Sequence, residues 1–241
     1  MNIYFNEKII KTIIYTNMSE EIKNEESTED SPDYDLTFKI IVLGDSGVGK
    51  SCLTLKATRN QFDAIYSPTI GFEFLTFTVK VGEKRIKLQI WDTCGQEVYR
   101  SLISSFYRNS SLAVLVYSID SENSFSNLES WLNELKSQGN IDMNIFLVGN
   151  KSDLEEKREV STDEGRQFSD EHGIKYFFET SAKTGFNAKE VFIEAAKLLN
   201  EQHLKFKDVA SRPESMENLN IAMSNQENMN DDAKRKKKCC F

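Results

Sequence analysis

The feature that most constrains this chain is a glycine-rich loop, residues 44–51, with the sequence GDSGVGKS. It follows a β-branched apolar run at 38–43, which predicts a buried strand, and it precedes a segment that can continue as a helix. A strand, a G-x-x-x-x-G-K-[ST] loop and a helix in this order are typical of a loop that binds nucleotide phosphates. The alternative, a chance glycine-rich turn, is disfavoured by these flanks.

Physical chemistry explains why this loop suits an anion. Its glycines let the backbone turn successive N–H groups inward, and the following helix directs its positive end to the same point. Lys50 would neutralise the β- and γ-phosphates, and the Ser51 hydroxyl would bind Mg²⁺. The nucleotide contacts predicted here come from Ser46, Gly47, Val48, Gly49, Lys50, Ser51 and Cys52.

Composition narrows the class of protein. The chain has 241 residues and a formal net charge of -8, and no basic stripe runs through its apolar-rich middle, which argues against general nucleic-acid binding. Its four cysteines form neither a disulfide framework nor a zinc-ligand spacing, so we expect a reducing, intracellular compartment. No apolar run is long enough to span a bilayer.

From residue 37 to 204 apolar strand patterns alternate with helical ones, which predicts a parallel sheet. A short turn at 82–84 makes two strands a hairpin, so one edge strand runs antiparallel. We therefore expect an α/β fold: a six-stranded, mostly parallel sheet with one antiparallel edge strand and helices on both faces. The predicted strands are 38–43, 74–81, 85–91, 112–117, 145–149 and 175–179.

Helical patterns lie between and after these strands. Apolar residues at helical spacing predict one helix that buries Phe125, Leu128, Leu132 and Leu135. Ser161 with Glu164 has the spacing of a helix N-terminal capping box.

The two ends of the chain differ from this domain. Residues 1–36 are rich in acidic and polar residues and are expected to be a disordered leader. Residues 205–241 are expected to be a flexible tail that ends in five consecutive cations, Cys239, Cys240 and Phe241.

A second element, WDTCGQE at 91–97, follows an apolar strand. Asp92 closes that strand, where a carboxylate can hold the Mg²⁺ shell. Gly95 can offer its N–H to a γ-phosphate, and Gln96 can orient a water for in-line attack. A solvated strand end is the alternative for Asp92, and the position of D-x-x-G-Q one hairpin after the phosphate loop disfavours it.

A third element, NKSD at 150–153, follows the predicted fifth strand. The Asp153 carboxylate can accept two parallel hydrogen bonds from guanine, and adenine presents no such pair of donors. Asn150 and Lys151 would brace the loop and the base. After the sixth strand, Ser181, Ala182 and Lys183 would pack against the other side of the base. These loops follow the carboxyl ends of strands, where open α/β sheets bind ligands.

In this order the four motifs resemble those of the Ras-like small GTPases, over residues 37–202. Finer marks are similar to the Rab branch: the GDSGVGKS loop, IGFEF at 70–74, KLQIWDT at 87–93 and the terminal cysteine pair. The resemblance implies the G domain of a P-loop NTPase at 37–204. It also implies Gln96 as the catalytic residue and a Mg²⁺ site made by Ser51, Thr69 and Asp92.

The resemblance assigns further roles and partners. Phe62 should lie edge-on to the guanine, and Tyr66 should close over the phosphates. Residues 63–73 and 94–107 should be switch loops, ordered by the γ-phosphate and released after hydrolysis. The implied partners are a guanine-nucleotide exchange factor, a GAP, a GDP-dissociation inhibitor, an escort protein and effectors on these loops, with no nucleic acid. The protein is expected to act as a monomer.

The chain end reads as a membrane anchor. Five cations attract an anionic leaflet, and two cysteines permit the two lipid chains that stable anchoring takes. Lys238 is the fourth residue from the end, so a C-a-a-X box is absent. The Cys-Cys-x ending resembles the doubly geranylgeranylated Rab terminus, which implies the cytoplasmic face of intracellular membranes with cycling through the cytosol. A nuclear localisation signal is the competing interpretation of the basic run.

Four places depart from the usual Rab pattern. This chain has Cys94 where the family has Ala, and Val98-Tyr99 where it has Arg-Phe. It also differs at residues 107–110, where the family has Tyr-Arg-Gly-Ala, and at Ser118, where the family has Asp. Three functions therefore compete. The first is a slow GTPase switch that recruits effectors in vesicle trafficking. The second is a non-hydrolysing GTP-binding membrane adaptor in which Cys94 freezes the bound state. The third is an ATP-using kinase or ATPase, which Asp153 disfavours.

Overall fold

The structure is a computed structural model. It describes residues 34–63, 69, 71–95, 107, 109–139 and 143–210, with side chains up to residue 207. The predictions for the leader up to residue 33 and for the tail beyond residue 210 lie outside these residues.

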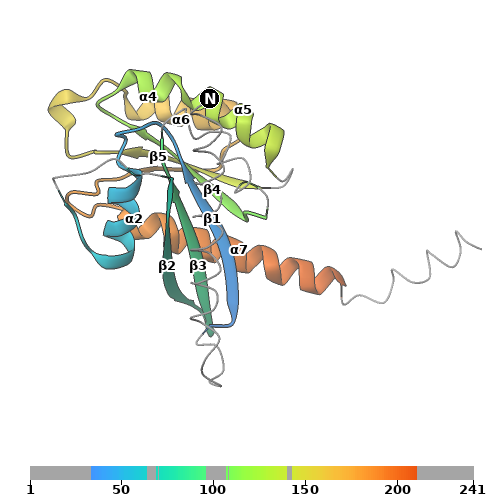
Figure 1. Ribbon diagram of the computed structural model, residues 1–241. Helices are drawn as coiled ribbons and strands as arrows, with labels where there is room; N and C mark the ends of the chain where they lie inside the picture. The colour runs from blue at the N-terminus through green and yellow to red at the C-terminus, as the bar shows by residue number, and fades with distance from the viewer. Residues whose placement is uncertain are drawn as a thin grey trace, which may run out of the picture.

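One six-stranded sheet organises the domain (Figure 1). Its strands, in the spatial order β2-β3-β1-β4-β5-β6, are β2 (Phe72–Val81), β3 (Lys84–Thr93), β1 (Leu36–Leu43), β4 (Leu112–Ser118), β5 (Asn144–Asn150) and β6 (Tyr176–Glu179). The edge strand β2 pairs antiparallel with β3, and every other pair is parallel. The predicted sheet is confirmed, including its antiparallel edge.

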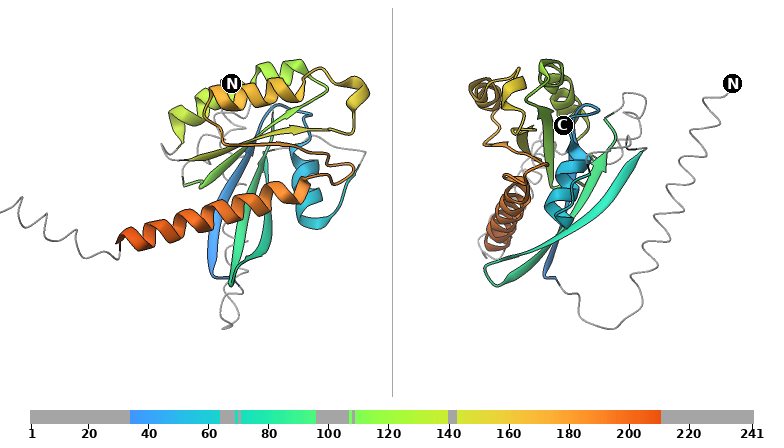
Figure 2. Two further views of the ribbon diagram at one scale, coloured as in Figure 1. Left: turned by 180° about the vertical axis from the view of Figure 1, so that it is seen from behind. Right: turned by 90° about the vertical axis from the view of Figure 1, so that its left-hand side faces the viewer.

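Helices cover both faces of the sheet, as predicted (Figure 2). The helices α2 (Lys50–Arg59) and α7 (Ala188–Ala210) lie on one face. On the other face lie α4 (Glu122–Ser126), α5 (Leu128–Gln138) and α6 (Thr162–Glu171), while a 3₁₀ turn, η2 (Glu155–Lys157), follows β5. Strand β1 explains why two layers are needed, because Ile40 and Val42 pack into one core and Ile41 and Leu43 into the other.

Local sequence sets the helix ends, with two differences from expectation. Ser161 and Glu164 form the predicted capping box at the start of α6. The predicted apolar stripe at 125–135 is divided between α4 and α5, which meet at Asn127. Helix α7 continues past residue 204 to Ala210, although the polar composition there favours a tail.

The carboxyl ends of β1, β3, β5 and β6 lead into the four loops that carry the sequence motifs. Parallel strands place such ends at one edge of the sheet, so the loops at 44–49, 94–95, 151–153 and 180–183 meet there. The fold therefore assembles one site from segments far apart in the sequence.

Phe146 tests the core on the α7 face. Its ring is fully buried in β5 and stacks on Tyr176 with 4.5 Å between centroids. Phe146→Ala should lower the free energy of unfolding by about 3–5 kcal/mol, because it removes a buried ring and leaves a cavity. Urea unfolding under identical solution conditions measures this. Phe206→Ala is the matched control, since that ring is 74% exposed, and equal losses in both variants would contradict the packing described.

Candidate functional site

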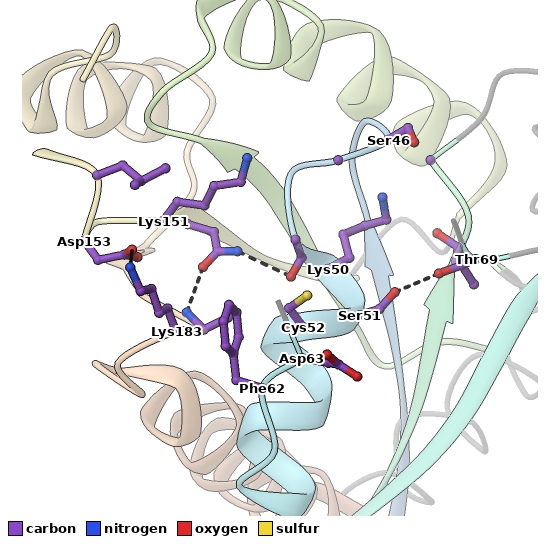
Figure 3. Close-up of a pocket in the computed structure, with 17 residues that line it drawn as sticks. Ser46, Lys50, Ser51, Cys52, Phe62, Asp63, Thr69, Lys151, Asp153 and Lys183 are labelled. Carbon is purple, nitrogen blue, oxygen red and sulfur yellow. Dashed lines mark hydrogen bonds and ion pairs between the residues drawn. The ribbon is translucent and has the colours of Figure 1, made fainter. Parts of the chain in front are cut away.

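A cavity of about 280 Å³ lies where these loops meet. Its two ends differ in chemistry (Figure 3). Lys151, Asp153, Lys183 and Phe62 gather at one end, and at the other lie side chains from the glycine-rich loop and Thr69. The lining residues are Ser46, Gly47, Gly49, Lys50, Ser51, Cys52, Phe62, Asp63, Thr69, Thr93, Gly95, Asn150, Lys151, Asp153, Leu154, Ala182 and Lys183.

Lys50 supplies a buried positive charge at the phosphate end. Its ammonium donates to the carbonyl oxygens of Gly44 at 2.8 Å and Asp45 at 2.7 Å. Burial lowers the pKa of Lys50 to about 8, and the nearby Asp92 carboxylate partly opposes this shift. The side chain therefore remains mostly protonated at neutral pH and can neutralise a phosphate.

Ser51, Thr69 and Asp92 converge beside this charge, as the predicted metal site requires. The Ser51 hydroxyl donates to Asp92 Oδ2 and lies 2.9 Å from the Thr69 hydroxyl. Asp92 is fully buried, and burial raises its pKa to about 6, against the opposing hydrogen bond from Ser51. A carboxylate that is buried this deeply needs a positive partner.

One atom tests whether these residues fit Mg²⁺. Asp92 Oδ1 is buried and accepts no hydrogen bond from the residues that the structure describes. A carboxylate oxygen without a donor, beside two hydroxyls, matches a hard cation that takes few protein ligands and completes its shell with phosphate oxygens and waters. Ser51, Thr69 and Asp92 would therefore hold Mg²⁺, which when bound neutralises charge across the β- and γ-phosphates.

Asp153 lies at the opposite end and is held by the loop that follows β6. Its Oδ1 accepts from the Ser181 hydroxyl at 2.6 Å, and its Oδ2 lies 3.8 Å from the Lys183 ammonium. These contacts orient the carboxylate, which lines the cavity, and each of its two oxygens keeps capacity for a further donor. Ser181 itself stands behind the cavity wall, while Ala182 and Lys183 line it.

Asn150 joins the two ends of the site rather than facing ligand alone. Its Nδ2 donates to the carbonyl oxygens of Val48 at 2.9 Å and Gly49 at 3.3 Å. Its Oδ1 accepts from the Thr180 hydroxyl at 3.1 Å and the Ala182 N–H at 3.3 Å. Val48, a predicted nucleotide contact, packs its side chain into the core and takes part only through its backbone.

Gly49 lies against this brace in the left-handed region, with φ 91°. A Cβ there would stand 2.4 Å from Asn150 Nδ2, so glycine is required by both conformation and space.

Lys151 is fixed by a carboxylate that the sequence analysis did not single out. Its backbone lies in the left-handed region at φ 65°, and its ammonium lies 3.4 Å from Asp120 Oδ1. Burial raises the pKa of Asp120, but the Ser118 hydroxyl bond and the Lys151 charge outweigh it, and the net pKa is lowered. Ser118, which departs from the usual Rab residue, thus orients Asp120 against Lys151.

The remaining predicted residues divide into two groups. Cys52 and Phe62 line the cavity, and Phe62 is 40% exposed, which suits a ring at the edge of a base. Gln96 and Tyr66 lie outside the described residues, so their predicted roles stay predictions. Three lining residues were not predicted, and each directly follows a predicted one in the sequence: Asp63, Thr93 and Leu154.

Gly95 brings the second motif onto the glycine-rich loop. A Cβ at this position would stand 2.3 Å from the Asp45 carbonyl carbon and 2.3 Å from the Ser46 nitrogen. Only glycine therefore lets the loop after β3 approach the phosphate-binding backbone this closely. The Gly95 N–H is thus held at the end of the cavity where a γ-phosphate is expected.

The family model for the Ras family matches residues 39–201, which is more than half of the chain. This protein belongs to the Ras family. Ras-family proteins bind GTP or GDP with Mg²⁺, hydrolyse GTP, and interact with exchange factors, GAPs and effectors. The matched region contains every lining residue of the cavity. The residues at the two ends of the cavity suit a guanine nucleotide, with the guanine at the Asp153 end and the phosphates at the Lys50 end.

Asp92 offers a direct test of the metal site. Asp92→Asn keeps the shape of the side chain but removes its charge, so the Mg²⁺ concentration that half-maximally slows GDP release should rise at least about tenfold. Release of a fluorescent GDP analogue, measured across a Mg²⁺ titration, gives this value. Asp120→Asn is the matched control and should leave it unchanged. An unaltered Mg²⁺ dependence in Asp92→Asn would show that the metal is held elsewhere.

Proposed function

We propose that this Ras-family protein is a Rab-type GTPase, a switch that hydrolyses GTP slowly and recruits effectors in intracellular vesicle trafficking. Its GTP form would act on the cytoplasmic face of intracellular membranes, and its GDP form would cycle through the cytosol. The Rab-like sequence marks at 70–74 and 87–93 and the terminal cysteine pair support this finer assignment.

The observation that carries the proposal is an aromatic cluster on the β2–β3 hairpin. Phe72 and Phe74 lie on β2, and each ring centroid is 5.2 Å from that of Trp91 on β3. All three rings are only partly buried. Partly exposed aromatic rings are typical anchors of protein–protein interfaces.

The position of this cluster links it to the nucleotide. Phe72 directly follows Gly71, near the end of the first predicted switch loop, and Trp91 lies three residues before Cys94, at the start of the second. The Cys94 N–H donates to the Gly71 carbonyl oxygen at 3.0 Å, so the two loops are joined at their bases. A change at the γ-phosphate would therefore reach the cluster, which suits a surface that effectors read.

The proposed switch and a non-hydrolysing adaptor differ in the role that each gives to Cys94. The residue is buried, and it directly precedes Gly95, which lines the phosphate end of the cavity. Because Thr69 and Asp92 are positioned as a metal site needs, we favour hydrolysis. Among the residues that the structure describes, no arginine lines the cavity, and a partner GAP would add roughly 10³–10⁵-fold to the rate.

Single-turnover release of γ-phosphate from bound GTP tests this choice. The parent should hydrolyse slowly, Gln96→Leu should stop hydrolysis because the attacking water loses its orienting amide, and Cys94→Ala should change the rate little. An inert parent whose turnover is restored by Cys94→Ala would instead support the membrane adaptor. Competition of ATP against bound GDP serves as the control for base identity, and equal competition by ATP and GTP would contradict the guanine site.

Membrane attachment would come from the chain end. In the part of the chain that the structure describes, no helix is both long enough and apolar enough to cross a bilayer. Two lipid chains on Cys239 and Cys240 would anchor the protein stably, with the five preceding cations adding attraction of about 1 kcal/mol each.

The intact mass of protein made in eukaryotic cells tests the anchor. The parent should carry two geranylgeranyl groups and sediment with membranes, and Cys239→Ser with Cys240→Ser should move it to the soluble fraction. Each single variant is the matched control and should bind membranes weakly and reversibly, because one chain gives only marginal affinity. An unmodified parent that accumulates in the nucleus would favour the localisation-signal interpretation of the basic run.

A further inference from the structure

The carboxylate of Asp45, in the glycine-rich loop, is held by helix α5. Its Oδ1 accepts a hydrogen bond from Trp131 Nε1 at 2.8 Å, and its Oδ2 accepts one from Asn127 Nδ2 at 2.7 Å. Trp131 is fully buried in the core beneath α5, so its N–H has a fixed position. Asn127 is the residue at which α4 ends and α5 begins, and its side chain is exposed.

The main chain of the same residue meets both phosphate elements. The Asp45 carbonyl oxygen accepts from the Lys50 ammonium at 2.7 Å. Its carbonyl carbon is one of the atoms that leave no room for a Cβ on Gly95. A shift of Asp45 would therefore move the Lys50 charge and the Gly95 N–H together. Among the described contacts of the glycine-rich loop, only those of Asp45 reach Lys50, Gly95 and the start of α5 at once.

We call the contacts of Asp45 with Asn127 and Trp131 the clamp, and the charge of Asp45 gives this clamp a second effect. A carboxylate beside bound phosphates is repelled by them, and two donors, Trp131 on α5 and Asn127 at its start, hold this one on the helix side. Without them the carboxylate would be free to turn toward the phosphates.

We propose that Asn127 and Trp131 are positioning residues that act through Asp45 to set the distance between the glycine-rich loop and the Gly95 loop. This inference rests on the proposed GTPase function and deepens it, because it names α5 as an element that controls nucleotide retention. Lys50 serves both nucleotides, but the Gly95 N–H is expected to meet only the γ-phosphate. The clamp therefore favours GTP over GDP.

Trp131→Phe is the main test, because it removes the N–H and keeps most of the buried ring. Release of a non-hydrolysable GTP analogue should become about tenfold faster, the effect of losing one hydrogen bond to a charged group. Release of GDP should change less, so the ratio of the two rates should shift. A purely structural role for Trp131 would accelerate both releases equally, and that result would overturn the proposal.

Asp45→Ala, alone and combined with Trp131→Phe, tests whether the faster analogue release comes from losing the hydrogen bond between Trp131 and Asp45. If it does, adding Trp131→Phe to Asp45→Ala should change analogue release little further, because the acceptor is already absent. Independent, multiplying effects would overturn the proposal. Asn127→Ala keeps the test valid if the tryptophan variant folds poorly, since this exposed residue can be replaced without opening a cavity, and it should accelerate analogue release about threefold.

The matched control is a variant of α5 that touches neither Asp45 nor a predicted switch loop. Glu134 itself contacts Tyr107 of the predicted switch loop, so the control used is Ser137→Ala, which removes a different hydrogen bond of α5, the one that the Ser137 hydroxyl donates to the Glu134 carbonyl oxygen at 2.9 Å, and should leave the ratio of release rates unchanged. The parent reports separately on the proposed function: a parent that binds no guanine nucleotide refutes that function. A parent that binds GDP and the GTP analogue while all three clamp variants behave like it refutes only the role of α5.

Discussion

The side chain of Asn150 is the interaction on which the site depends. It is almost fully buried at the end of β5 and makes four hydrogen bonds, two to the glycine-rich loop and two to residues 180–182. A buried amide costs free energy unless its donors and acceptors are satisfied, so each partner loop is held where Asn150 needs it. The phosphate-binding end and the base-binding end are thereby fixed relative to each other.

Preorganisation of this kind has a price in buried charge. Lys50 and Asp92 are both withdrawn from water, and burial moves their pKa values toward neutrality from opposite sides. Their mutual attraction offsets part of this cost, and Mg²⁺ and phosphate would supply the remainder. The site is therefore most stable when it holds its ligands, which is the behaviour expected of a protein that keeps its nucleotide through many encounters.

Much of the fold could be predicted because the sequence carries strong local signals. Continuous apolar runs indicate strands that are buried on both faces, and the turn at 82–84 marks the hairpin, so all six strands were placed to within about two residues. The capping box of α6 was equally local. The break at Asn127 was missed because the apolar spacing continues through it, and the end of α7 was missed because its last turns have polar composition.

The candidate site likewise contains residues that local sequence signals predict and residues that they do not. Residues of the four motifs could be assigned because their chemistry follows from their spacing. The contacts of Asp45 with α5, and of Asp120 with Lys151, could not, because each joins segments 31 or more residues apart and only the tertiary structure brings them together. Sequence reasoning identified the groups that face ligand better than the groups that hold them.

Helix α7 also separates the nucleotide site from the C-terminal segment of the chain. It begins just after the Ser181–Lys183 loop at the nucleotide site and runs for 23 residues, a length of about 35 Å, along and past the sheet (Figure 1). The segment that leads to the terminal cysteines therefore starts far from the nucleotide. With the proposed anchor in a bilayer, the mouth of the pocket can face the cytosol, and a nucleotide could be exchanged without lifting the protein from its membrane.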